Sequence, residues 1–133
     1  MTKFQRDGYN LLNTLYGNSL SVQVTDAGVA VVTIDQPDSK VNSLGEDMVN
    51  AFPGMFNDLS ANTDVKSILL RSAKKGCFVA GADIDMLNKV STREEALAIS
   101  TNGQAIFAQI ESSEKPVIAA LNGATEWFFK FHI

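Results

Sequence analysis

The chain has 133 residues, which is the usual length of a single domain. Hydrophobic residues make up 45% of it, which argues against intrinsic disorder, and the net charge of −4 without a basic stripe argues against a nucleic-acid partner. The one cysteine, Cys77, can form no internal disulfide and belongs to no metal-ligand spacing, so we expect no metal site. No apolar run reaches the length that spans a bilayer, so we expect no membrane span.

The composition divides the chain into an N-terminal arm (1–18), a domain (19–124) and a divergent tail (125–133). The arm carries Lys3 and Arg6 among apolar residues with few acids, which gives weak support to a targeting peptide. A frayed arm is the alternative. The tail crowds aromatic residues together without the periodicity of a strand or a helix.

The domain begins with a predicted β-hairpin. Residues 19–25 alternate apolar and polar side chains, which is the period of a half-buried strand. Residues 26–28 have turn chemistry, and the β-branched run 29–35 follows as the partner strand. Residues 36–40 form a loop, because Pro37 and Asp38 favour turns.

A helix is expected after that loop. Ser43 and Glu46 have the spacing of a capping box. Apolar residues then recur at helical spacing and predict one buried face: Met48, Phe52, Met55, Phe56 and Leu59. Pro53 lies inside this pattern, so we expect a bend or break there.

The rest of the domain predicts two buried strands and a second long helix. The apolar runs 65–72 and 117–121 are typical of strands covered on both faces. Thr92 and Glu95 form a second capping box that opens a helix through residue 112. Its residues available to the core are Leu97, Ile99, Ile106, Phe107 and Ile110. The order ββαβαβ predicts an α/β fold that is largely parallel after the hairpin.

The turn at Gly81, Ala82 and Asp83 is the first candidate for chemistry. It follows a strand and precedes a short helical stretch, 84–88. Small residues let a ligand approach the backbone, and N–H groups there could stabilise a developing oxyanion. Such turns are more often ordinary connectors, and the same holds for Asn122-Gly123.

The other candidates are weaker. His132, the only histidine, has no nucleophile in a plausible order beside it. Cys77 is expected to be a small core residue, and Lys74-Lys75 a solvated loop pair that could alternatively meet phosphates. Asp83 and Asp85 without histidine or cysteine make no metal site.

Four segments, 29–34, 37–42, 76–87 and 115–123, resemble in order those of the crotonase (enoyl-CoA hydratase/isomerase) superfamily. They are most similar to the N-terminal hydratase domain of the α-subunit of the mitochondrial trifunctional enzyme, and bacterial multifunctional β-oxidation α-subunits are similar. The match covers residues 20–124 and is specific as a set. It implies the N-terminal half of a crotonase-like fold built from ββα repeats.

The resemblance implies a fragment of an enoyl-CoA hydratase of fatty-acid β-oxidation, which adds water to 2-enoyl-CoA to give 3-hydroxyacyl-CoA. The parent protein would also be a 3-hydroxyacyl-CoA dehydrogenase. NAD would belong to that absent domain, so no cofactor is expected in this segment. The resemblance further implies a mitochondrial location and contact with a thiolase β-subunit.

The resemblance also implies site residues. The backbone N–H of Ala82 would be one of two oxyanion-hole donors to the thioester carbonyl. The CoA moiety would be surrounded by Lys40, Val41, Ala80, Gly81, Asp83 and Ile84, with Lys40 facing phosphate.

The family pattern breaks after Asn122-Gly123. The three glycines of the family fall at Trp127, Phe128 and Phe129, where bulky side chains prevent a close backbone approach, and its first catalytic glutamate falls at Phe131. The second glutamate would lie beyond residue 133. Hydration needs an acid and a base, each contributing roughly 10²–10⁴-fold, so we expect negligible hydratase activity from this chain alone. The alternative hypothesis is a non-catalytic module that binds CoA thioesters or a sister subunit.

Overall fold

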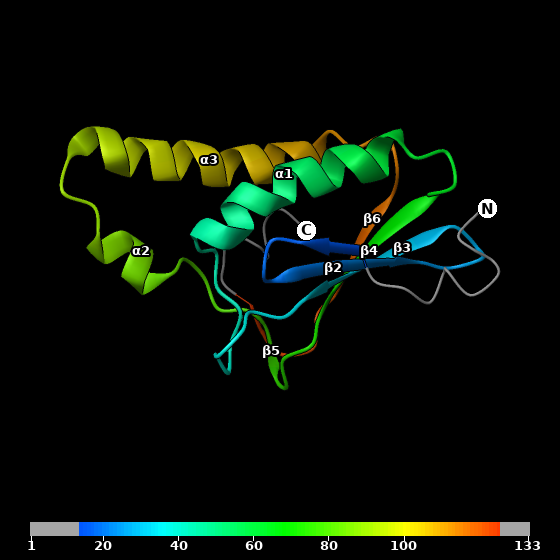
Figure 1. Ribbon diagram of the computed structural model, residues 1–133, viewed down its shortest axis with the longest axis horizontal. Helices are drawn as coiled ribbons and strands as arrows, with labels where there is room; N and C mark the ends of the chain where they lie inside the picture. Colours follow the sequence, from blue (N-terminus) through cyan, green and yellow to red (C-terminus); the bar gives the residue numbers. More distant parts are fainter. Residues whose placement is uncertain (1–13, 126–133) are drawn as a thin grey trace.

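The computed structural model describes residues 14–125, which form a mixed α/β fold (Figure 1). In chain order the elements are β1 (Thr14–Tyr16), β2 (Leu20–Val24), β3 (Val29–Ile34), α1 (Glu46–Ala61), β4 (Ser67–Ser72), β5 (Cys77–Val79), α2 (Ile84–Asn88), α3 (Arg93–Glu111), β6 (Val117–Ala120) and β7 (Ala124–Thr125). Among residues 14–125, none of the helices combines the length and the hydropathy of a transmembrane segment.

The main sheet has five strands in the order β1-β2-β3-β4-β6. β1, β2 and β3 pair antiparallel, whereas β3, β4 and β6 pair parallel. This confirms the predicted hairpin and the parallel sheet after it. β5 and β7 form a separate two-stranded parallel sheet. The short strands β1 and β7 were not predicted.

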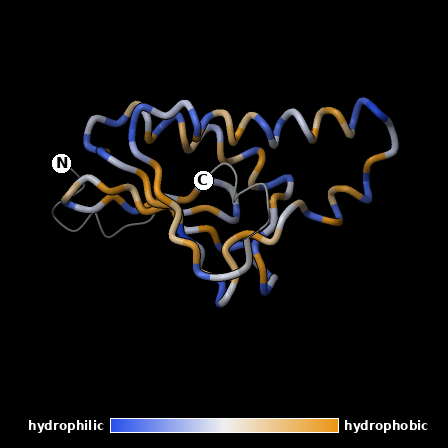
Figure 2. The backbone as a smooth tube through the Cα atoms, turned by 180° about the vertical axis from the view of Figure 1, so that it is seen from behind, coloured by the Kyte–Doolittle hydropathy of each residue, from blue (hydrophilic) through white to orange (hydrophobic). Residues whose placement is uncertain are grey.

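The long helices α1 and α3 cover the same face of the main sheet (Figure 1). The predicted apolar face of α1 is confirmed, because all five of its residues are buried. Hydrophobic residues are concentrated in the strands, whereas the helices alternate between hydrophobic and hydrophilic positions (Figure 2). The core is thus a single layer between one sheet face and two helices.

The start of α1 differs from the prediction. Its N-cap is Gly45 rather than Ser43, and Gly45 makes no side-chain capping bond. The Ser43 hydroxyl donates instead to Gln36 Oε1, at 2.9 Å. Leu44 pairs with Ala82 in a parallel bridge, which keeps the backbone extended up to Gly45. A long-range contact therefore overrides the local capping signal.

Of the bend or break expected at Pro53, the break does not occur, because α1 is continuous from Glu46 to Ala61. Proline removes one backbone donor, but Phe52, Met55 and Phe56 on either side are buried and hold the helix on the sheet. Gln109 of α3 donates its Nε2 to the Pro53 carbonyl, at 3.2 Å. The second helix gives more support there.

The predicted capping box of α3 is confirmed, with Thr92 as the N-cap and Glu95 reaching back. Its predicted burial is only partly correct. Ile106 and Phe107 are buried, but Leu97 is 64% exposed. Leu97 belongs to the N-terminal half of α3, and this half reaches beyond the main sheet toward α2 (Figure 1).

The predicted two-sided burial of the parallel strands is wrong. β4 alternates buried residues with more exposed ones, and Ile118 in β6 is 56% exposed. Both long helices lie on one side, and no helix of residues 14–125 covers the other. The apolar runs correctly predicted two strands, but they did not indicate that no helix of residues 14–125 covers one face of the sheet.

Candidate functional site

The turn at Ala82 is fixed by a parallel pairing with the segment before α1. The Leu44 N–H donates to the Gly81 carbonyl at 2.7 Å, and the Asp83 N–H donates to the Leu44 carbonyl at 3.1 Å. The neighbours of Ala82 make both bonds, so its own N–H donates to no acceptor among residues 14–125. Gly81 has φ of 112°, which an L side chain rarely adopts.

Asp83 fixes the other side of the turn by capping α2. Its Oδ1 accepts from the N–H groups of Asp85 at 2.8 Å and Met86 at 3.3 Å. Gly45 approaches so closely that an added Cβ would lie 2.8 Å from Asp83 Oδ2. The Asp83 carboxylate is therefore a structural cap, and Ile84 after it is exposed.

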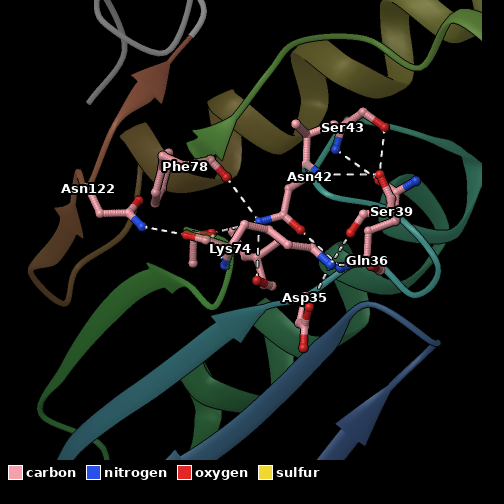
Figure 3. Close-up of polar contacts among 11 residues, drawn as sticks. Asp35, Gln36, Ser39, Asn42, Ser43, Lys74, Phe78 and Asn122 are labelled. Atoms are coloured by element: carbon pink, nitrogen blue, oxygen red, sulfur yellow. Dashed lines mark hydrogen bonds and ion pairs between the residues drawn. The ribbon is translucent and has the colours of Figure 1, made fainter. Parts of the chain in front are cut away.

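Asn42 is fully buried, and its side chain lies among those of the contacts drawn in Figure 3. Its Nδ2 lies within hydrogen-bond distance of the Ile34 carbonyl (3.1 Å), the Ser72 hydroxyl (2.9 Å) and the Phe78 carbonyl (3.0 Å). Its Oδ1 accepts from the Gln36 N–H at 2.9 Å. One side chain thus joins the ends of β3, β4 and β5.

Lys74 makes a second set of internal contacts in this region (Figure 3). Its ammonium pairs with Asp35 Oδ1 at 2.8 Å and donates to the carbonyls of Gln36 at 2.5 Å and Ser39 at 2.7 Å. The side chain is 11% exposed. The prediction of a solvated pair at Lys74-Lys75 is therefore wrong for Lys74, whose charge is used inside the protein.

Lys40 and Val41 lie on the exposed loop that Lys74 and Asn42 hold. The Lys40 ammonium has no partner among the described residues. Asn42 accepts from the Ala80 N–H through its carbonyl, at 2.7 Å. The structure thus places the loop that carries Lys40 next to the segment Ala80 to Ile84.

An apolar pocket of about 400 Å³ lies beside Ala82, between α1 and α3. Its wall is formed by Leu44, Val49, Ala82, Met86, Ile99, Ser100, Gly103, Gln104, Phe107, Ala108 and Glu111. A second pocket, of about 580 Å³, adjoins it through Val49, Met86 and Ile99. This second pocket is more polar, because Glu46, Asp85 and Glu95 line it.

The enoyl-CoA hydratase/isomerase family model matches residues 24–126. The chain belongs to this family. It is similar to the fatty acid oxidation complex subunit alpha of Idiomarina loihiensis, at 38% identity over 106 residues, which are 80% of this chain and 15% of that protein. The corresponding subunit of Shewanella halifaxensis is 38% identical over 99 residues, covering 74% of this chain and 14% of that protein.

Solved structures of the family confirm the predicted crotonase-like fold. An enoyl-CoA hydratase/isomerase family protein of Hyphomonas neptunium has a TM-score of 0.71 and 36% identity, covering 79% of this chain and 40% of that one. An enoyl-CoA hydratase of Shewanella pealeana has a TM-score of 0.72 and 26% identity, with 79% and 39% covered. The chain thus spans about two-fifths of these relatives.

The mitochondrial location implied by the resemblance is wrong. The curated relatives belong to Idiomarina and Shewanella, which are bacteria and have no mitochondria. The match to α-subunits of fatty-acid oxidation proteins is confirmed. The mitochondrial location had been inferred from the mitochondrial members of that group alone. Residues 1–13 of the arm considered as a targeting segment (1–18) lie outside the described residues, as do residues 126–133 of the aromatic tail (125–133), with His132.

The sequence predicted the turn at Ala82 as a candidate site but did not predict the contacts that hold it. The small residues around Ala82 were a usable signal. Asn42 and Lys74 gave none, because their side chains contact residues far away in the sequence, such as Phe78 for Asn42 and Asp35 for Lys74. Cys77 is buried as predicted, and no group of three or more metal-ligating side chains gathers within residues 14–125.

The N-terminus of α3 borders the more polar pocket, which Glu95 lines, and its stability should respond to pH. The Ser91 N–H and hydroxyl, and then the Thr92 N–H, donate to Glu95 and hold the pKa of its carboxyl below its usual value. A folded pKa below the unfolded one stabilises the cap at pH above about 4.3, the unfolded value, and loses this effect as pH falls through the folded pKa. Amide exchange in the first turn of α3 should therefore rise in acid.

The matched variant for this pH experiment is Glu95→Gln, whose amide oxygen keeps the capping acceptor without titrating. Its first-turn exchange should lack the acid transition. Equal acid transitions in the two proteins would show that Glu95 does not control this helix end.

Proposed function

We propose that the chain binds 2-enoyl-CoA thioesters of fatty-acid β-oxidation and presents the Ala82 N–H to their carbonyl oxygen. The observation that carries the proposal is a backbone donor with no acceptor among residues 14–125, beside an apolar pocket. Membership in the hydratase/isomerase family supports the ligand class, as do relatives named fatty acid oxidation complex subunits.

The proposed role of the Ala82 N–H is to stabilise negative charge. Adding water across the conjugated double bond develops an enolate on the thioester oxygen, and a preorganised N–H dipole stabilises that charge. In this chain the position of the first catalytic glutamate holds Phe131. We therefore propose binding and carbonyl polarisation without hydration, and we assign neither the lyase reaction nor NAD-dependent oxidation to this chain. Contact with a thiolase β-subunit stays a prediction.

The CoA moiety would lie along Lys40, Val41 and the backbone from Ala80 to Ile84. Lys40 supports this placement because its ammonium is exposed and unpaired among the described residues. Asp83 is proposed to act through its backbone, since its carboxylate already caps α2. The roles of Gly81 and Ala80 are likewise backbone roles, which their small side chains permit.

The acyl chain is proposed to enter the apolar pocket beside Ala82. An acyl chain contributes affinity by burying methylene groups, each worth about 0.8 kcal/mol. Gly103 lines this pocket, and an added Cβ there would meet nothing within 4 Å. The pocket and the Ala82 N–H thus lie where the tail and the carbonyl of one thioester can be bound together.

The experiment is a binding comparison between crotonyl-CoA and crotonyl-pantetheine, which lacks all the phosphates. Lys40→Ala should weaken crotonyl-CoA by about 10–100-fold, because a charge-assisted hydrogen bond to phosphate contributes about 1.5–3 kcal/mol. It should leave crotonyl-pantetheine unchanged. Titration calorimetry at fixed salt gives both affinities.

The matched control is Lys75→Ala, which removes an exposed lysine of the other loop. It should leave both affinities within about twofold, as expected of a surface substitution. Failure of the unsubstituted chain to bind crotonyl-CoA, or equal losses for the two ligands in Lys40→Ala, would contradict the proposed function.

A further inference from the structure

We propose that Lys74 is a positioning residue, which shapes the loop 35–40 so that the Lys40 ammonium meets the CoA phosphates. This inference rests on the proposed function of Lys40. Lys74 itself would not touch the ligand. Its side chain is 11% exposed, and its ammonium is committed to atoms of the protein.

The three oxygens around the Lys74 ammonium all belong to the segment directly before Lys40. They are the Asp35 carboxylate and the carbonyls of Gln36 and Ser39. A lysine ammonium has three N–H donors, so these contacts use all of them. Because the carbonyls of Gln36 and Ser39 point toward the Lys74 ammonium, the exposed Lys40 can extend from the outer side of the loop.

Lys74 is in turn held by the rest of the site. Its backbone N–H donates to the Ser72 hydroxyl at 2.9 Å, and Asn122 Nδ2 donates to its carbonyl at 2.8 Å. The same Ser72 hydroxyl accepts from Asn42 Nδ2. Lys74 therefore connects the loop before Lys40 to the end of β4 and to the turn after β6.

A surface ion pair with Asp35 does not by itself explain why the Lys74 ammonium is buried. Asp35 is 59% exposed, and exposed pairs contribute little to stability. The buried part of the contact is the ammonium on the two loop carbonyls. Asp38, between them, has φ of 56°, an unusual conformation for a residue other than glycine, so the loop needs outside contacts to keep its shape.

The test is a double-mutant cycle between Lys74 and Lys40, read by calorimetric titration of the full chain. Lys74→Met should weaken crotonyl-CoA about tenfold, at the lower end of the loss for Lys40→Ala. It should leave crotonyl-pantetheine within twofold, and it should add nothing in the Lys40→Ala background. This non-additivity is expected only when Lys74 acts through Lys40.

Asp35→Asn is the control variant, because it removes the ion pair and leaves the carbonyl contacts. Its affinity for crotonyl-CoA should stay within twofold of the unsubstituted chain. Should Lys74→Met fail to fold, Lys74→Gln serves in the same cycle, because its amide offers N–H donors without a charge.

The outcomes separate this inference from the proposed function. Equal losses for both ligands would make Lys74 a general structural residue, and a persisting loss in the Lys40→Ala background would make it a direct contact. Either result, or an unchanged affinity, overturns the positioning role. If Lys40→Ala weakens the binding of crotonyl-CoA and Lys74→Met does not, the positioning role of Lys74 is wrong but the proposed function is retained.

Discussion

Asn42→Ala is expected to lower the free energy of unfolding by about 3–4 kcal/mol, because several buried polar groups lose their partner together. The Ile34 and Phe78 carbonyls, the Ser72 hydroxyl and the Gln36 N–H all contact this one amide. A buried polar group left without a partner costs about 1–3 kcal/mol, and the side chain also leaves a cavity. Relaxation and entering water recover part of this cost.

The measurement is urea unfolding followed by circular dichroism. The matched control is Asn102→Ala, which removes an exposed asparagine of α3 whose side chain makes no hydrogen bond within residues 14–125. It should change stability by no more than about 0.5 kcal/mol. A loss below about 1 kcal/mol for Asn42→Ala would mean that this amide does not hold the ends of β3, β4 and β5.

Gly123→Ala is expected to cost about 2–4 kcal/mol, because two loops touch through their backbones at this point. A Cβ on Gly123 would lie 2.1 Å from the Gly76 carbonyl oxygen, a distance that no real Cβ contact reaches. Gly76 itself has φ of 70°, in the left-handed region that residues other than glycine rarely adopt. The loops must separate, which pulls β7 away from β5.

The matched control is Gly54→Ala in α1, where an added Cβ meets nothing within 4 Å. Alanine is favoured over glycine in a helix by up to about 1 kcal/mol, so this variant should be as stable as the original or more stable. Urea unfolding gives both values, and amide exchange in β5 reports the local effect. Similar stabilities for the two variants would refute the close contact.

The parts of the fold that depend on local signals were predictable from the sequence. The alternation in β2, the β-branched run that forms β3, the apolar face of α1 and the cap at Thr92 are confirmed, because each depends on residues a few positions apart. The cap at Ser43 failed because Leu44 pairs with Ala82, far along the chain. Periodicity also gave no sign that β6 has an open face.

The candidate site was predictable in its composition but not in its support. Small residues and family resemblance pointed to Ala82 and Lys40, and both are exposed with an unused donor among residues 14–125. Lys74 looked like a solvated lysine because a sequence does not show which carbonyls a loop turns inward. The contact between Gly76 and Gly123 was likewise hidden inside an ordinary Asn-Gly turn signal.

The most direct test of the account is isotope-edited infrared spectroscopy of crotonyl-CoA carrying ¹³C at the thioester carbonyl, mixed with an excess of this chain. A hydrogen bond from Ala82 should shift the carbonyl stretch to lower frequency, while the conjugated double-bond band persists because Phe131 occupies the position of the family's first catalytic glutamate. An unshifted carbonyl would show that the Ala82 N–H does not receive the thioester. Decay of the double-bond band would show that the chain carries out hydration, which contradicts binding without turnover.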